Sequence, residues 1–242
     1  MANLLVEIGN TALKAAWSEG TTLGKTFRYQ GEKVMEFILS LTEREKPDVL
    51  CVASARVLTE PQEAALSAEC RHLIILDSGH TTALLGYSLP EFLSFDRAAS
   101  LLAARFLFRG KPCSVFDFGT TLTVDFLDTE GRYRGGNISP GCRTRFMSLN
   151  RYTKSLPVVD TPVDIPREGT SVQTAIEAGV ISGIMFEIEG YMRQYPDHIV
   201  VFTGGDAAYF AGKMSHSVFV VANMVLMGLA IMTDDYVKKY IQ

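Results

Sequence analysis

Apolar and polar positions follow two periodicities along the chain, and the change from one to the other marks the predicted elements. Short runs rich in β-branched and aromatic residues predict strands, whereas apolar positions three or four residues apart predict helices. The predicted strands are Leu4–Ile8, Val49–Ala53, Leu73–Leu76, Ser114–Phe118, Leu122–Leu127, Ile199–Thr203 and Val218–Val221. The predicted helices are Gly31–Glu45, Pro61–Cys70, Asp96–Phe108, Gly169–Tyr195, Ala207–Lys213 and Met224–Tyr240. This alternation predicts a layered α/β fold.

Two short segments of the chain share one pattern of residue types. Leu5–Thr11 reads Leu-Val-Glu-Ile-Gly-Asn-Thr, and Val115–Thr121 reads Val-Phe-Asp-Phe-Gly-Thr-Thr. Both patterns run through two apolar residues, an acid, an apolar residue, a glycine, a polar residue and a threonine. The repeat predicts two halves of similar architecture, residues 1–111 and residues 112–242, with a chance similarity inside one large domain as the alternative.

The two glycine turns have a composition suited to holding phosphate. Glycine lets backbone N–H groups approach an anion closely, and asparagine or threonine adds further hydrogen-bond donors. The acid two positions before each glycine, Glu7 or Asp117, lies on the same strand face as the glycine and can hold a cation. The alternative for either acid is a buried, hydrogen-bonded residue in a tight hairpin.

A third glycine turn, Thr203–Ala207, follows a predicted strand and opens a predicted helix. Gly204 and Gly205 allow a flat ligand such as a nucleotide base to lie against the backbone. The alternative is a purely structural turn, with Asp206 capping the helix. Neither G-x-x-x-x-G-K-[ST] nor G-x-G-x-x-G is present, which disfavours P-loop and Rossmann sites.

Composition and charge limit the classes of partner that the chain is expected to bind. The 23 basic and 27 acidic residues give a net charge of −4, so no basic field favours nucleic acid. The longest apolar stretch, Val218–Met232, is interrupted by Asn223 and is short for a membrane span. Four cysteines without a C-x-x-C pair indicate buried thiols in a reducing compartment. We therefore expect a cytoplasmic protein that contacts neither nucleic acid nor membrane.

Taken in order, the motifs carry a family resemblance. Glu7–Lys14, Asp117–Asp125 and Thr203–Ala207 resemble the phosphate-1, phosphate-2 and adenosine segments of the actin-like ATPase and sugar kinase superfamily. With Tyr87–Arg97 and Gly135–Gly141, the chain resembles the type III pantothenate kinases. The resemblance implies a duplicated ribonuclease H-like fold, in which two similar α/β halves face a nucleotide cleft. It also implies ATP-dependent phosphorylation of pantothenate to 4'-phosphopantothenate, the first step of coenzyme A biosynthesis.

The resemblance assigns roles to individual residues. Asp96 is the implied general base at the primary hydroxyl of pantothenate, and it is also a candidate N-cap for the helix that follows. Asp117 is the implied ligand of a monovalent cation, K+ or NH4+, while Mg2+ accompanies ATP. The implied ATP contacts are Glu7, Ile8, Gly9, Asn10, Thr11, Ala12, Leu13, Lys14, Thr120, Gly204 and Gly205. The implied pantothenate contacts are Tyr87, Ser94, Phe95, Asp96, Arg97 and Val172.

Three positions depart from the pattern of the family. Glu7 stands where the family has aspartate, Ser94 where it has glycine, and Val172 where it has threonine, with Thr170 as a weak substitute. Such changes are expected in a protein that has lost catalysis. The alternative function is therefore a kinase-like regulatory or accessory protein that binds nucleotide without turnover. A sugar or acetate kinase of the same superfamily is a third possibility.

The resemblance also implies a homodimer. The predicted helix Gly169–Tyr195 carries Met185, Phe186 and Met192 in addition to the apolar positions that one buried face requires. Burial of these side chains against a second copy is one explanation, and a central position within a single chain is the other.

Overall fold

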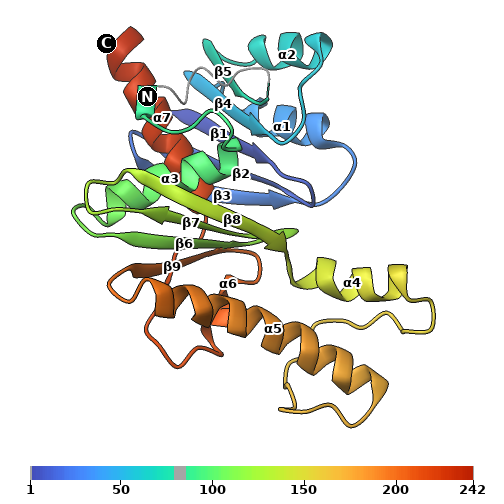
Figure 1. Ribbon diagram of the computed structural model, residues 1–242. Coiled ribbons are helices and arrows are strands. Elements are labelled where there is room, and N and C mark those ends of the chain that lie inside the picture. Colours follow the sequence, from blue (N-terminus) through green and yellow to red (C-terminus); the bar gives the residue numbers. More distant parts are fainter. Residues whose placement is uncertain (1, 79–85, 242) are drawn as a thin grey trace. The chain divides into compact units, whose positions relative to one another are not determined.

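The computed structural model describes residues 2–78 and 86–241, which fall into two compact units (Figure 1). The first unit comprises Met1–Leu107 and Asn223–Gln242, and the second comprises Phe108–Ala222. The expected halves, residues 1–111 and 112–242, differ from these units mainly at the C-terminus. The last helix is grouped with the first unit because it packs on that unit's sheet.

The sheet of the first unit has five strands in the order β3-β2-β1-β4-β5. Strands β1 (Asn3–Ile8), β2 (Leu13–Glu19) and β3 (Thr22–Tyr29) form an antiparallel meander. Strands β4 (Val49–Ser54) and β5 (His72–Leu76) extend it in parallel to β1. Helices α1 (Val34–Thr42) and α2 (Glu60–Ser67) cover one face, where a cluster of aliphatic side chains is buried.

Two helices of the first unit contact each other closely, α3 (Phe95–Leu107) and α7 (Met224–Tyr240). A Cβ atom at Gly228 of α7 would lie only 1.9 Å from the carbonyl oxygen of Ala99 in α3. The two backbones are therefore in direct contact, and only glycine fits at this position. Helix α7 also contacts β1, β2, β3 and β4, so it anchors α3 to the first sheet.

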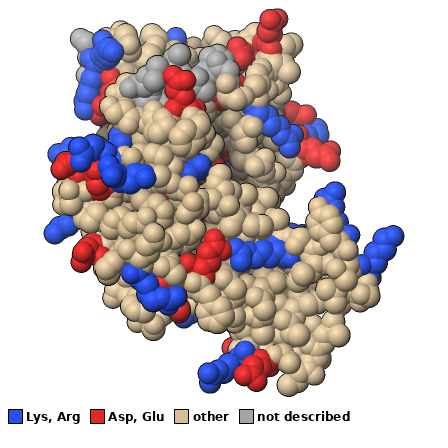
Figure 2. All heavy atoms as spheres, in the orientation of Figure 1, with Lys and Arg blue, Asp and Glu red and all other residues tan. Residues whose placement is uncertain are grey.

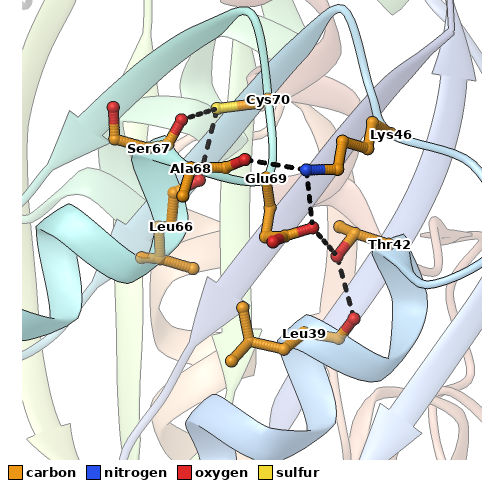
Figure 3. Close-up of polar contacts among 8 residues, drawn as sticks. All are labelled: Leu39, Thr42, Lys46, Leu66, Ser67, Ala68, Glu69 and Cys70. Atoms are coloured by element: carbon orange, nitrogen blue, oxygen red, sulfur yellow. Dashed lines mark hydrogen bonds and ion pairs between the residues drawn. The ribbon is translucent and has the colours of Figure 1, made fainter.

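A polar network joins the end of α1 to the end of α2 (Figure 3). The Lys46 ammonium lies 3.5 Å from the Glu69 carboxylate and donates to the Ala68 carbonyl at 2.9 Å. The Thr42 hydroxyl contacts the same carboxylate at 3.3 Å, and the Cys70 thiol donates to the Leu66 carbonyl at 3.4 Å. These contacts satisfy groups at the two helix ends and hold the connection into β5.

The sheet of the second unit repeats the strand order of the first. Strands β6 (Cys113–Phe118), β7 (Thr121–Leu127) and β8 (Tyr133–Pro140) form an antiparallel meander. Strands β9 (Ile199–Gly204) and β10 (Phe219–Val220) continue the sheet in parallel from β6. The order β8-β7-β6-β9-β10 therefore matches β3-β2-β1-β4-β5 element for element. This duplication confirms the predicted fold class.

Three helices pack on one face of the second sheet, α4 (Cys142–Tyr152), α5 (Val172–Gln194) and α6 (Ala207–Ala211). Their core is rich in aromatic residues: Phe118 of β6 lies 4.8 Å from Phe202 and 5.1 Å from Phe210, between ring centroids. Aromatic pairs in contact stabilise a core beyond the contribution of their buried area. Strands β6, β7 and β9 are buried almost throughout, and alternate residues of each one, such as Phe116 and Phe118 of β6, contribute to this core.

Four elements escape the sequence prediction: β2, β3, β8 and α4. Strands β3 and β8 lie at the meander edge of their sheets and have no fully buried residue, and they lack the apolar runs on which strand prediction depends. Helix α4 buries only Cys142 and Phe146, which leaves its amphipathic pattern weak.

Charged side chains of both signs appear on the face shown in Figure 2. Within the described ranges, 2–78 and 86–241, no helix is both long and apolar enough to cross a membrane.

Candidate functional site

The first glycine turn joins β1 to β2. The Gly9 amide donates to the Ala12 carbonyl at 3.1 Å and closes the turn. Gly9, Asn10 and Thr11 are exposed at its tip. The tip therefore presents a glycine and two short polar residues to solvent, the composition expected for an anion-binding turn.

Glu7 lies at the base of this turn and is compensated by a lysine. Glu7 and Lys14 are directly opposite each other in the β1–β2 pairing, and the Lys14 ammonium lies 3.6 Å from Oε2 of Glu7. That oxygen is buried and has no hydrogen-bond partner. Burial raises the pKa of Glu7, Lys14 lowers it, and the negative charge of Asp96 raises it further. The structure therefore brings Glu7, Lys14 and Asp96 into one electrostatic cluster.

Asp96 lies in the first turn of α3 and is exposed. Its predicted position as the helix N-cap is wrong, because α3 begins at Phe95 and the Ala98 amide donates to the Ser94 carbonyl at 2.9 Å. A carboxylate in the first turn interacts favourably with the helix dipole and remains accessible to a ligand. The neighbouring Arg97 is buried, with 8% of its surface exposed.

Serine is accommodated at position 94 without backbone strain. Among the described non-glycine residues, only Ser88 and Asn223 have a positive φ angle. Ser94 therefore needs none of the conformational freedom that glycine provides.

Tyr87 is held by the two helices that contact each other in the first unit. Its hydroxyl donates to Oδ2 of Asp235 in α7 at 3.1 Å, and its carbonyl accepts from Nη1 of Arg105 in α3 at 2.6 Å. Burial is the main cause that raises the pKa of Tyr87, and the charge of Asp235 adds to it. Tyr87 is therefore fixed through both its side chain and its backbone.

The second glycine turn joins β6 to β7 and packs against the start of α4. The Gly119 amide donates to the Thr121 carbonyl, and the Thr120 carbonyl accepts from the Gly141 amide at 3.0 Å and from the Thr144 hydroxyl at 2.6 Å. A Cβ atom at Gly141 would lie 2.1 Å from the Gly119 carbonyl oxygen. This turn is therefore supported from behind, while Gly119 and Thr120 remain exposed in front.

The third glycine turn meets the second. Gly204 has a φ of +94°, and a Cβ atom there would lie 2.4 Å from Oδ1 of Asp117. The Asp206 amide donates to the Phe118 carbonyl at 3.3 Å. Only glycine allows the backbone to approach the Asp117 carboxylate this closely. The structure therefore brings Asp117 and Gly204 together, with the exposed Gly205 beside them.

Asp206 occupies the N-cap position of α6, but its side chain makes no capping hydrogen bond. Burial raises the pKa of its carboxyl group.

Val172 is the first residue of α5 and is 56% exposed. The polar residues around it are used to cap that helix: the Thr174 hydroxyl accepts from the amides of Thr170 and Ser171 at 3.0 and 2.9 Å. Ser171 is the N-cap and accepts from the Thr174 amide. The exposed side chain at this position is therefore apolar, and a pantothenate contact here stays a prediction.

Sequence reasoning missed two residues of these sites. Gly141 belongs to a motif used only for the family resemblance, and its contact with the second turn appears only in the folded chain. Asp235 lies 148 residues from its partner Tyr87, and no local pattern marks it.

The described residues contain no cluster of three or more His, Cys, Asp or Glu that is able to hold a metal ion. A cation at these turns would therefore need ligands from the bound nucleotide or the backbone as well as from a single carboxylate.

Comparison with known proteins identifies the family. The sequence profile of the type III pantothenate kinases matches residues 3–194. A type III pantothenate kinase from Phocaeicola vulgatus is 36% identical over 234 residues, which cover 94% of this chain and 96% of that protein.

Solved structures share the fold at lower identity. A Campylobacter jejuni protein assigned to the Baf family of transcriptional activators superposes with a TM-score of 0.64 at 20% identity, covering 97% of this chain and 99% of that one. The activator of 2-hydroxyisocaproyl-CoA dehydratase from Clostridium difficile, solved with bound ADPNP, gives 0.57 at 14% identity, covering 99% and 96%. These similarities support the fold alone, whereas the sequence matches establish that the chain belongs to the type III pantothenate kinase family.

Proposed function

We propose that this protein phosphorylates pantothenate with ATP and produces 4'-phosphopantothenate and ADP, the first step of coenzyme A biosynthesis. The observation that carries the proposal is the family match over residues 3–194, with Asp96 exposed on α3. Relatives named as kinases favour turnover over the alternative of a nucleotide-binding accessory protein.

In the proposed reaction, the primary hydroxyl oxygen of pantothenate attacks the γ-phosphorus of ATP. The bond from that phosphorus to the β–γ bridging oxygen breaks, and ADP leaves with the electron pair. Asp96 orients the hydroxyl and accepts its proton. In a loose transition state of this kind, positioning and charge neutralisation contribute more than proton abstraction.

The glycine turns supply the proposed nucleotide contacts. Residues 7–14 form the first phosphate segment, whose tip at Gly9, Asn10 and Thr11 is exposed. Thr120 of the second turn contacts the phosphates, and Gly204 and Gly205 receive the nucleoside. The support for this assignment is that Gly204 and the second turn are adjacent.

Two cations fit the residues present. Magnesium bound to ATP neutralises phosphate charge, and Oε2 of Glu7 is a buried oxygen without a hydrogen-bond donor that suits an ion or an ion-bound water. We assign the monovalent cation, potassium or ammonium, to Asp117, whose carboxylate lies against the backbone at Gly204. Single carboxylates fit this chemistry because Mg2+ usually keeps its waters and phosphate ligands.

The proposed pantothenate contacts of the first unit are Tyr87, Ser94, Phe95, Asp96 and Arg97, and Val172 is the contact proposed in the second unit. A guanidinium group suits a carboxylate, so Arg97 is assigned to the carboxylate of pantothenate. An exposed apolar side chain at Val172 suits the aliphatic part of the substrate better than its polar groups.

We further propose a cytoplasmic homodimer. Large apolar side chains are exposed on three elements of the second unit, at Ile138, Met147, Tyr152 and Phe186. The Arg145–Glu187 ion pair and the Ser139–Glu187 hydrogen bond connect these elements. Patches of this kind commonly mark interfaces. All four cysteines are free, which agrees with a reducing compartment.

A product assay tests the proposed function. Purified protein with ATP, magnesium and potassium should convert pantothenate to its phosphate ester, and a panel containing sugars and acetate should give no product. ATP binding by calorimetry without product from any substrate would instead establish the nucleotide-binding accessory protein. Light scattering at the mass of one chain would contradict the dimer.

A further inference from the structure

The hydrogen bond between Tyr87 and Asp235 joins the Tyr87–Arg97 segment to the C-terminal helix α7. Oδ2 of Asp235 accepts the hydroxyl proton of Tyr87 at 3.1 Å, across 148 residues of sequence. Asp235 is exposed, and its neighbour Asp234 is paired instead with Lys238 at 2.6 Å. The two adjacent carboxylates of α7 thus have different partners, Lys238 for Asp234 and Tyr87 for Asp235.

This bond determines what the tyrosine oxygen can offer to a ligand. A phenol has one proton to donate and otherwise accepts hydrogen bonds. Burial and the charge of Asp235 raise the pKa of Tyr87, so the proton stays on the hydroxyl at neutral pH. Because that proton is donated to Asp235, the oxygen faces a ligand as an acceptor, and donation to a carboxylate strengthens this acceptor.

The supports of Tyr87 belong to a rigid part of the first unit. Arg105 in the last turn of α3 holds the Tyr87 carbonyl at 2.6 Å, and Asp96 lies in the first turn of the same helix. The backbones of α3 and α7 touch at Gly228. Asp235 is two helical turns beyond Gly228, on the same face of α7. The tyrosine oxygen and Asp96 are therefore held by one pair of packed helices.

We propose that Asp235 is a positioning residue, which holds Tyr87 so that the tyrosine oxygen accepts a hydrogen bond from an N–H or O–H group of pantothenate. The proposal rests on the proposed function. It gives a residue of the C-terminal helix a role in the recognition of pantothenate without a contact to the substrate. It also predicts that Asp235 contributes to pantothenate binding and leaves ATP binding unchanged.

Steady-state kinetics of the full chain test the proposal. Tyr87→Phe and Asp235→Ala should each raise the KM for pantothenate roughly tenfold, the effect of one lost hydrogen bond to or through a charged group. The KM for ATP should stay unchanged. The double variant should be no worse than either single variant, because both remove the same hydrogen bond. Asp235→Asn keeps an acceptor oxygen and should recover much of the affinity.

Asp234→Ala is the matched control, because it removes the adjacent carboxylate of α7 and should leave both KM values as in wild type. Calorimetric binding of ATP to each variant confirms that the variants are folded. An unchanged pantothenate KM in Asp235→Ala would overturn the proposal, as would equal increases in both KM values or multiplied effects in the double variant. A wild-type protein without pantothenate kinase activity would overturn the proposed function itself.

Discussion

The two acid-glycine-threonine turns share a backbone plan but differ in how their charge is balanced. In the first, Glu7 faces Lys14 across the β1–β2 hairpin. In the second, the corresponding position opposite Asp117 is the neutral Thr123, and the backbone at Gly204 lies beside the carboxylate. The first turn thus carries its own positive charge. The cation proposed at the second turn is the monovalent ion assigned to Asp117.

The turns also differ in their support. A Cβ atom at Gly9 would lie 3.1 Å from the Ala12 carbonyl oxygen of its own turn, and the tip of this turn is exposed. At the second turn, Gly141 approaches from the start of α4, where a Cβ atom would lie 2.1 Å from the Gly119 carbonyl oxygen. Duplication of a fold therefore preserves the hairpin, while the packing around each copy diverges.

Replacement of Asp96 by asparagine should have the largest effect on activity, because Asp96 is the proposed general base. Its charge also acts on Glu7 at the first turn. We expect kcat to fall by about 10²–10⁴-fold, the range for loss of a general base. ATP binding should persist, since the second turn is unchanged. Steady-state kinetics and calorimetry measure the two quantities. Glu91→Gln, which alters an exposed carboxylate before α3, is the control, and full activity in Asp96→Asn would remove Asp96 from the mechanism.

Alanine substitution of Gly141 beside the second turn and of Gly9 in the first compares how tightly the two turns are packed. Gly141→Ala forces a side chain into the Gly119 carbonyl, so we expect the free energy of unfolding to fall by about 2–3 kcal/mol. Gly9→Ala meets one carbonyl at 3.1 Å in an exposed turn and should cost about 1 kcal/mol or less. Urea unfolding measures both. Equal losses would show that the two turns are supported alike.

The dependence of activity on potassium tests which of the two turns binds the monovalent cation. Asp117→Asn should raise the potassium concentration needed for half-maximal activity by roughly tenfold, because a charged ligand is lost. Glu7→Gln should keep the wild-type dependence, since Lys14 already balances that site. Activity is measured against KCl, with choline chloride holding the ionic strength constant. A potassium response that survives in Asp117→Asn would place the cation elsewhere.

The smallest expected effect concerns stability and pH at the first turn. Burial raises the pKa of Glu7 above its ordinary value of 4.5, so the folded state binds this proton more tightly than the unfolded chain does. The stability that Glu7 contributes is therefore present below pH 4.5 and is lost as pH rises through the higher folded value. Glu7→Gln should accordingly gain stability relative to wild type over this window.

Thermal unfolding across the pH range measures the difference between Glu7→Gln and wild type. Removal of the Asp96 charge should narrow the pH range over which this difference develops, because that charge raises the pKa of Glu7 in the folded state. A difference that does not change with pH would contradict the assigned electrostatic cluster.

The elements with a continuous buried face are the ones that the sequence predicts well. The structure has β4 at Val49–Ser54 and α7 at Met224–Tyr240, against predictions of Val49–Ala53 and Met224–Tyr240. Edge strands such as β3 are missed because they have no fully buried residue, so the apolar signal is weak. The start of α3 is misplaced because Asp96 is an equally good residue for the N-cap and for the first turn.

The sequence by itself determined the local chemistry of this protein: the glycine turns, the acids beside them, the order of the motifs and hence the family. These properties depend on residues that are neighbours in the chain. Only the tertiary structure decided that Gly204 lies against Asp117, that Gly141 supports the second turn and that Asp235 holds Tyr87. Each of these contacts joins segments distant in the chain, so it exists only after the sheets and helices have packed.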